Sequence, residues 1–300
     1  MIDLSGRVAI ITGAGAGLGR AHAKLLAAHG ARVVINDLSE AQAHAVADEI
    51  TAAGGSAVAV AASVTDFGAV QQMVDRTLER WSRIDILVNN AGILRDKTFA
   101  KMDLADFRLV VDVHLMGAVH CTKAVWEPMR RQGYGRIVMT TSSSGLYGNF
   151  GQSNYGAAKM AQVGLMQTLA LEGERNNVRV NCIAPTAATK MTDALLPRDE
   201  LELLLPERVS PAVLALVRED APTRTIVCAG AGSFAAANVT LTQGIHLEDG
   251  EDVAERLVSR WTEIIDRTNE LVPDTGERQG REQLAKAGHV RQYLGSKQHA

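Results

Sequence analysis

The stretch Arg7-Val-Ala-Ile-Ile-Thr12, continued by Gly13-Ala-Gly-Ala-Gly17-Leu-Gly19, decides the fold of this chain of 300 residues. Its first half is a short apolar run without alternation, which is typical of a strand buried on both faces of a parallel sheet. Its second half is a glycine-rich turn, and a helical stretch follows over residues 20–29. The order strand, turn and helix is therefore predicted.

The next segment adds a second strand and an acid. Residues 31–36 form another apolar run, and it ends at Asp37, 18 residues after Gly19. Glycines allow a backbone to approach a pyrophosphate, helix-end N–H groups bind its charge, and a carboxylate at this distance accepts hydrogen bonds from the adenosine ribose. Asp37 would repel a 2′-phosphate, so we expect NAD(H) rather than NADP(H).

Strands and helices continue to alternate up to residue 232. Strands are expected at 56–62, 84–89, 135–141, 178–183 and 225–228, and helices at 39–53, 66–81, 103–131, 153–174 and 210–217. The long helical region is expected to break near His114 and to bend at Pro128. The pattern predicts an α/β fold: a doubly wound, parallel, seven-stranded sheet of the Rossmann type, with helices on both faces and a domain spanning residues 1–232.

The remaining residues, 233–300, are expected to form a C-terminal extension. The second glycine cluster, at 228–235, has no third glycine and no acid at the right distance, so we interpret it as a turn. A strand is expected at 239–247 and an amphipathic helix near 251–270, followed by a polar tail over 273–300. Residues 186–207 have no clean period and are interpreted as a mobile helical lid.

A catalytic set is expected in the segment from Ser142 to Lys159. If residues after Asn154 are helical, Tyr155 and Lys159 lie one turn apart on the same face, where the ammonium would favour the phenolate. A tyrosine with a lowered pKa can exchange a proton with an alcohol near neutral pH, and Ser142 can hydrogen-bond the same oxygen. This combination suits the interconversion of an alcohol and a carbonyl.

Composition limits the other classes of function. The net charge of −3 shows no basic excess, so nucleic acid is not expected as a partner. No apolar run is long enough for a membrane span, no leader opens the chain, and its last residues are not a peroxisomal address, so a cytoplasmic protein is expected. The histidines lack metal-like spacing, and no metal site is expected.

On these residues the chain resembles the short-chain dehydrogenase/reductase family over roughly residues 5–232. Residues 12–19 resemble its cofactor turn, Asn89-Asn90-Ala91-Gly92 its sheet-stabilising motif, and Ser142 with Tyr155-Gly-Ala-Ala-Lys159 its catalytic set. The resemblance implies that the tyrosine exchanges the proton, the lysine binds the nicotinamide ribose and lowers the pKa of the tyrosine, and the serine holds the substrate oxygen. Members are generally dimers or tetramers through long helices, which the apolar face from Val110 to Val125 permits.

Finer similarities point to one subgroup. The segments 89–96 and 147–152, and Ile183-Ala-Pro185 with Lys190-Met-Thr192, resemble the (3R)-hydroxyacyl-CoA dehydrogenase unit of peroxisomal multifunctional β-oxidation enzymes. The resemblance implies an oxidoreductase of lipid metabolism that acts on a (3R)-hydroxyacyl-CoA. A hydroxysteroid or another secondary alcohol is the alternative substrate, and a non-catalytic protein that senses NAD is the alternative class.

Three positions depart from the family pattern. His114 stands where many members have a catalytic asparagine, so we consider a proton relay, a role in the helix kink and simple packing. Ser63, with Val64 next, replaces the acid that often holds the adenine, and Thr186 replaces a glycine after Pro185. The residues expected to contact the cofactor are Gly13, Ala16, Gly17, Leu18, Gly19, Asp37, Leu38, Ser63, Val64, Asn90, Ala91, Gly92, Tyr155, Lys159, Pro185, Thr186, Ala188 and Thr189.

Overall fold

The computed structural model describes residues 2–188 and 198–288, and the chain divides into two compact units at Ala237 and Asn238. The first unit is built on one sheet with the strand order β3-β2-β1-β4-β5-β6-β7-β8. The strands are β1 (Val8–Thr12), β2 (Arg32–Asp37), β3 (Ser56–Ala61), β4 (Ile86–Asn89), β5 (Gly135–Thr140), β6 (Val178–Thr186), β7 (Ile226–Gly230) and β8 (Ser233–Ala237).

Strands β1 to β7 are parallel, and β8 returns antiparallel to β7. The expected sheet is confirmed, but it has eight strands where seven were expected. The eighth strand begins inside the glycine cluster, where Ala231 and Gly232 adopt positive φ angles of 50° and 76° and turn the chain back on itself. The turn expected at this cluster is therefore the tip of a β-hairpin.

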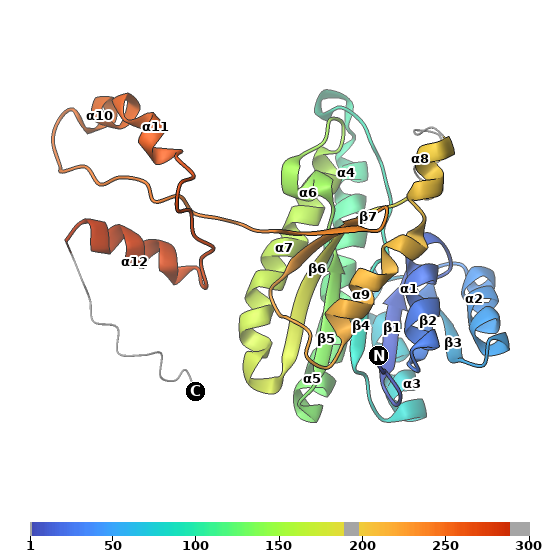
Figure 1. Cartoon of the computed structure of the whole chain (residues 1–300). Helices are drawn as coiled ribbons and strands as arrows, with labels where there is room; N and C mark the ends of the chain where they lie inside the picture. The colour runs from blue at the N-terminus through green and yellow to red at the C-terminus, as the bar shows by residue number, and fades with distance from the viewer. Residues whose placement is uncertain (1, 189–197, 289–300) are drawn as a thin grey trace. The chain divides into compact units, whose positions relative to one another are not determined.

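Helices cover both faces of the sheet (Figure 1). One face carries α1 (Gly17–Ala28), α2 (Glu40–Ala52) and α9 (Ser210–Val217), and the other carries α3 (Phe67–Trp81), α5 (Gly117–Gln132) and α7 (Ser153–Gly173). Side chains cap two of these helices: Ser39 Oγ accepts from Gln42 N–H (3.4 Å) and Asp66 Oδ1 accepts from Ala69 N–H (3.1 Å). Shorter elements are α4 (Leu104–Val111), α6 (Ser143–Tyr147), α8 (Arg198–Leu203) and the 3₁₀ turns Phe99–Lys101, Glu174–Asn176 and Pro206–Arg208.

Successive residues of the central strands point into different cores. Ile11 of β1 packs with Leu26 of α1 in one core, whereas its neighbour Ile10 packs with Val125 of α5 in the other. Both strand residues are completely buried, as the apolar run without alternation predicts. The two cores hold the carboxyl ends of the strands, and therefore the loops that follow them, in fixed positions.

The long helical region breaks where the sequence predicts. Residues Asp112–Met116 form a π-helical turn between α4 and α5, and His114 lies in the middle of it. A π-turn carries one extra residue, which frees backbone groups from the regular helical ladder. The carbonyl of His114 accepts a hydrogen bond from Gln162 Nε2 of α7 (2.8 Å), so the break is fixed from the neighbouring helix.

The second unit, residues 238–300, has its own short helices. These are α10 (Val253–Ser259), α11 (Trp261–Ile264) and α12 (Glu277–Lys286). The helix expected near 251–270 is present as two pieces separated at Arg260. The prediction of a strand at 239–247 was wrong, because this segment forms a single isolated bridge, between Leu241 and Leu271. The expected polar tail contains α12 up to residue 286, and the expected lid at 186–207 falls partly outside the described residues.

Candidate active site

The glycine-rich turn after β1 is too tightly packed for larger side chains. A Cβ on Gly13 would lie 2.8 Å from the Cα of Ala91, and one on Gly19 would lie 2.3 Å from the carbonyl oxygen of Gly13. Gly13 also has a positive φ of 61°, which favours glycine. Helix α1 starts at Gly17 with no side-chain cap and no acidic residue in its first turn. Its N-terminal N–H groups are therefore not satisfied by a side chain of the helix's own first turn.

Asp37 lies at the end of β2, next to this turn. Its Oδ2 accepts a hydrogen bond from Gly15 N–H (2.9 Å) and its Oδ1 accepts one from Ser39 N–H (3.0 Å). A Cβ on Gly15 would approach Asp37 Oδ2 to 2.9 Å, so the turn packs directly on the carboxylate. Asp37, the acid predicted from its spacing, is thus fixed beside the glycine-rich turn.

The motif after β4 is hydrogen-bonded to the same turn. Asn90 Nδ2 donates to the carbonyl oxygens of Thr12 (3.0 Å) and Gly13 (3.1 Å), and Thr12 Oγ1 accepts from the N–H groups of Asn90 and Ala91 (3.0 Å each). Strands β1 and β4 are neighbours at the point where the strand order reverses, which is where open parallel sheets bind ligands. These bonds set the distance between the two loops on either side of that crevice.

The expected catalytic residues come together beyond β5. Ser142 follows the strand and caps α6, while Tyr155 and Lys159 lie one turn apart near the start of α7. The ammonium of Lys159 is 5.5 Å from the centre of the Tyr155 ring and donates a hydrogen bond to the carbonyl oxygen of Thr140 (2.5 Å). Ser142 lies close enough to the Tyr155 phenol to lower its pKa by hydrogen bonding. The serine, phenol and amine are therefore gathered beyond the end of β5.

Burial dominates the titration of these groups. It lowers the pKa of Lys159 to about 7, because this lysine is only 2% exposed and its charge is poorly solvated. Burial raises the pKa of Tyr155 above its ordinary value, the hydrogen bond with Ser142 lowers it, and the charge of Asp96 raises it. In this arrangement Ser142 is the group that favours the phenolate.

His114 packs against the phenol. Its ring meets the Tyr155 ring edge-on, with centroids 5.1 Å apart, and its Nε2 lies 2.8 Å from the carbonyl oxygen and 3.0 Å from the amide nitrogen of Ile93. Its Nδ1 is buried and has no hydrogen-bond partner in the described part of the protein. Burial and the charge of Lys159 lower the pKa of His114 to about 3. The imidazole is therefore neutral at ordinary pH.

A cavity of about 330 Å³ joins the two halves of the site. Its walls bring together twelve of the residues expected from the sequence: Gly13, Ala16, Gly17, Leu18, Asp37, Asn90, Ala91, Gly92, His114, Tyr155, Lys159 and Pro185. Gly19 lies beneath the turn and Val64 is buried against Gly117. Ser142, Leu38, Ser63, Thr186 and Ala188 are outside the lining. Thr189 lies outside the described residues.

Two lining residues, Ile93 and Thr140, were not anticipated. Ile93 holds the ring of His114 through its backbone, and Thr140 accepts the lysine ammonium through its carbonyl. Backbone groups carry both contacts, so the side-chain type gives no signal for them. The position of Thr140 as the last residue of a strand, two residues before Ser142, is the one pattern that could have indicated it.

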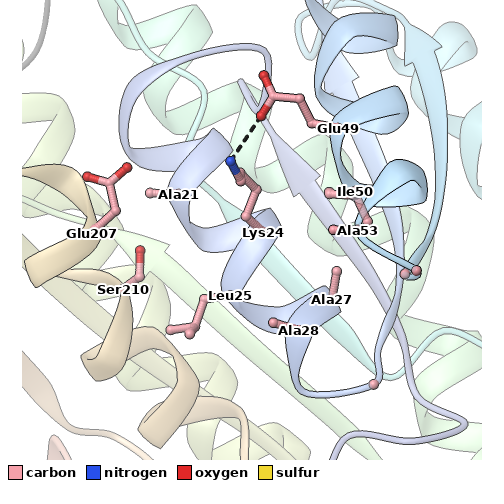
Figure 2. A pocket seen from close by; sticks show the side chains of 13 residues that line it. Ala21, Lys24, Leu25, Ala27, Ala28, Glu49, Ile50, Ala53, Glu207 and Ser210 are labelled. Atoms are coloured by element: carbon pink, nitrogen blue, oxygen red, sulfur yellow. Dashed lines mark hydrogen bonds and ion pairs between the residues drawn. The ribbon is translucent and has the colours of Figure 1, made fainter.

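A larger cavity of about 610 Å³ lies away from these residues, against α1 and α2 (Figure 2). It is lined by small apolar side chains such as Ala21 and Ala53, with an ion pair between Lys24 and Glu49 (3.0 Å) at its wall. None of the expected catalytic residues faces it. We place the active site in the smaller cavity because the acid–base groups and the glycine turn meet there.

Comparison with known proteins identifies the family of the chain. Residues 7–200 match the family described as short chain dehydrogenase. The chain is 46% identical to peroxisomal multifunctional enzyme type 2 of Drosophila melanogaster over 260 residues, covering 84% of this chain and 42% of that enzyme. A putative short-chain type dehydrogenase/reductase of Mycobacterium tuberculosis is 42% identical, with 89% of this chain and 96% of that protein covered. The chain thus spans less than half of the multifunctional enzyme.

Solved structures show the same relationship. The full-length Drosophila melanogaster multifunctional enzyme superposes with a TM-score of 0.81 at 38% identity, covering 95% of this chain and 50% of that one. A 7α-hydroxysteroid dehydrogenase, complexed with NADH and 7-oxo glycochenodeoxycholic acid, superposes with a TM-score of 0.72 at 32% identity, covering 77% and 95%. The chain therefore belongs to the short-chain dehydrogenase family of oxidoreductases.

Proposed function

We propose that this protein is an NAD-dependent dehydrogenase that interconverts a secondary alcohol and a ketone, and that its substrate is a (3R)-hydroxyacyl-CoA. One observation carries the proposal. The phenol of Tyr155 and the amine of Lys159 share a cavity with the glycine turn and with Asp37. Proton-exchanging groups and a dinucleotide cradle in one cavity are the requirements of alcohol oxidation.

The residues present fit a dinucleotide. The N-terminus of α1 has no side-chain cap, and Ala16, Gly17 and Leu18 line the cavity there, where a pyrophosphate would supply the missing charge. Asp37 supports NAD(H), because a carboxylate accepts hydrogen bonds from a ribose 2′-hydroxyl and repels a 2′-phosphate. Bound in this cavity, the nicotinamide would supply the hydride acceptor.

The chain's own residues would handle the proton. Ser142 and Tyr155 would both hydrogen-bond the hydroxyl oxygen of the substrate, and Tyr155, ionised to the phenolate that Ser142 favours, would take its proton. Lys159, whose pKa burial lowers to about 7, would offer the next place for that proton. The neutral ring of His114 closes one side of the phenol and limits its movement. In the direction of ketone reduction, the same groups would return the proton.

The choice of a thioester substrate is supported by the relatives. The multifunctional enzymes align with most of this chain, and a 3-oxoacyl-[acyl-carrier-protein] reductase of Synechocystis is 43% identical over 229 residues. That reductase aligns with 74% of this chain, whereas the multifunctional enzymes also align with part of residues 238–300. We therefore favour a hydroxyacyl-CoA over a carrier-bound acyl group.

A steady-state assay tests the proposal. The full chain should reduce NAD⁺ with a (3R)-hydroxyacyl-CoA. Its kcat/KM should be at least tenfold lower with the (3S) isomer and with NADP⁺, which corresponds to a difference of about 1.4 kcal/mol in activation free energy. Absence of turnover with the thioester, together with turnover of a hydroxysteroid, would refute the substrate.

A hydroxysteroid is the second candidate, because a relative of known structure binds 7-oxo glycochenodeoxycholic acid. A 17-hydroxysteroid and a 7-hydroxy bile acid belong in the same assay. A non-catalytic NAD-sensing role is disfavoured, since Tyr155 and Lys159 are both present and meet in the cavity. Binding of NAD⁺ without turnover of any of these alcohols would favour that role.

Assembly and location remain predictions. Val110 and Val125 are completely buried within the protomer, so a homodimer or homotetramer through this face would use Met116 (38% exposed), with Leu104 (66%) and Leu109 (41%) beside it. Light scattering on the purified chain measures the number of subunits. In the part of the chain that the structure describes, every helix is too short or too polar to cross a bilayer. The cytoplasmic location is tested by imaging the tagged protein, because several relatives are named as peroxisomal.

A further inference from the structure

Hydrogen bonds join the loop after β4 to the segment that opens α7. Lys97 N–H donates to the carbonyl oxygen of Gly151 (2.9 Å), and Asn154 Nδ2 donates to that of Arg95 (3.0 Å). Asn154 is completely buried, and its Oδ1 accepts from Tyr155 N–H (2.7 Å). The loop is therefore fixed against the residue that precedes the phenol.

Asp96 lies between these two attachments and bonds Gln152. The amide Nε2 of Gln152 donates to Asp96 Oδ2 (2.6 Å), while its Oε1 accepts from Ser144 Oγ (2.7 Å) and from Asn149 Nδ2 (3.1 Å). A carboxylate only accepts hydrogen bonds, so it holds the amide with its nitrogen toward Asp96. A flipped amide would set two oxygens against each other and leave the Ser144 hydroxyl without its acceptor. The acceptor oxygen of Asp96, together with the donors of Ser144 and Asn149, thus sets the direction of the amide.

Ser144 connects Gln152 to Ser142, since its hydroxyl bonds Gln152 and its backbone bonds Ser142. Its backbone N–H donates to Ser142 Oγ (3.2 Å), and both serines are 8% exposed. Because the Ser142 oxygen already accepts from the backbone, its own proton is available for the phenol or for a substrate oxygen. The hydrogen bond of Ser142 lowers the pKa of Tyr155, as a donor to a phenolate does. A chain of four residues therefore runs from Asp96 through Gln152 and Ser144 to Ser142.

We propose that Asp96 is a positioning residue of the active site, which acts through Gln152 and Ser144 to hold the Ser142 hydroxyl in line with the substrate oxygen. This inference rests on the proposed function of Ser142 and Tyr155. Asp96 contacts no reacting atom. It sets the direction of a hydrogen-bonded chain, and catalytic groups displaced by ~1 Å lose on the order of 100-fold in rate.

The test compares two changes at one position. In Asp96→Ala the acceptor is lost, and kcat should fall by roughly tenfold or more with a small change in KM for NAD⁺. In Asp96→Asn the side-chain oxygen still accepts from Gln152, so kcat should recover to within about threefold of the wild type. The matched control is Asp106→Asn, which removes the carboxylate that pairs with Lys97 (3.3 Å) in the same loop but lies outside the chain of four. Its kcat should equal that of the wild type.

Two further measurements separate positioning from general stability. Asp96→Ala and Ser144→Ala should be non-additive in kcat, because both break the same chain. Asp96→Asn should also move the pH profile of kcat to lower pH, since a negative charge that raises the pKa of Tyr155 is removed. The other polar groups that face the phenol stay in place in this variant: Ser142 after β5, His114 in the π-turn and Lys159 on α7.

The outcomes are distinct. Wild-type kcat in Asp96→Ala, or equal losses in Asp96→Ala and Asp96→Asn together with a lower melting temperature, would overturn the positioning role. An inactive wild type would instead overturn the proposed function. In that case crystal structures of the wild type and Asp96→Ala still decide, because an unmoved Ser142 Oγ and an unflipped Gln152 amide would overturn the inference.

Discussion

The ring of His114 meets the ring of Tyr155 edge-on, at an interplanar angle of 86°. The same imidazole also packs closely on Gly92, where an added Cβ would lie 2.2 Å from its Cε1. The histidine is thus enclosed by the phenol and by the backbone of Gly92. The size of the His114 side chain therefore sets the distance between the loop after β4 and the Tyr155 phenol.

Gly92→Ala should displace the imidazole and cost about 1–3 kcal/mol of unfolding free energy, as overpacking does. It should also lower kcat, because the imidazole limits the movement of Tyr155. The variant Gly92→Ala/His114→Ala relieves the clash and should recover part of the lost stability. Urea unfolding of the two variants checks this, and equal stabilities would contradict the proposed clash.

Tyr155→Phe should lower kcat by at least ~100- to 10,000-fold, the usual contribution of general acid–base catalysis. The phenyl ring preserves packing against His114, so the Kd for NADH should stay close to that of the wild type. Stopped-flow measurement of NADH formation and fluorescence titration of NADH give the two values. Residual turnover near the wild-type rate would show that another group exchanges the proton.

Lys159 should make stability depend on pH. Its pKa is about 7 in the folded protein and near 10.5 in the unfolded chain, so the unfolded state binds more protons between these values. The free energy of unfolding should therefore rise with pH from 7 toward 10.5, by up to ~1.4 kcal/mol per pH unit. Below pH 7 the full cost of burying the charged amine should remain. Lys159→Met should remove this dependence when thermal unfolding is measured without cofactor. A slope equal in both proteins would contradict the buried amine.

Asp37→Asn should shift cofactor preference. The amide can still accept from one of the two backbone N–H groups, but it loses the charge that repels a 2′-phosphate. We expect kcat/KM for NAD⁺ to fall by roughly 10- to 100-fold, the value of a hydrogen bond to a charged group, and the ratio of NADP⁺ to NAD⁺ efficiency to rise. Both cofactors are compared at saturating substrate. An unchanged ratio would show that Asp37 does not discriminate between them.

The sequence predicts the sheet and most of the cavity, because each of these features depends on local patterns. Strand β1 is an unbroken apolar run, the turn after it needs glycine at fixed positions, and Tyr155 and Lys159 are related by one helical turn. Strand β8 could not be predicted in this way. Its residues Ser233–Ala237 are mostly exposed and, apart from Phe234, small, and pairing with β7 rather than hydrophobic periodicity makes them a strand.

Other features depend on contacts between distant backbone groups. The role of Ile93 rests on its N–H and C=O groups, which any residue would supply, and the orientation of Gln152 depends on a carboxylate 56 residues earlier. The sequence predicts that the charge of Lys159 lowers the pKa of the Tyr155 phenol, but the strength of this effect depends on burial. Because burial lowers the pKa of Lys159 to about 7, its amine is a weaker source of positive charge than an exposed lysine. Side-chain identity alone does not contain that information.

The hydrogen bonds between Asn90 and Thr12 have a consequence for molecular recognition. They join the loops on either side of the crevice at the sheet's reversal point, using bonds that do not involve a ligand. The crevice is thus preorganised: its width is set when β1 and β4 pair. A dinucleotide then binds with little loss of backbone conformational entropy, and its affinity reports on the fit of its own groups rather than on the folding of the loops.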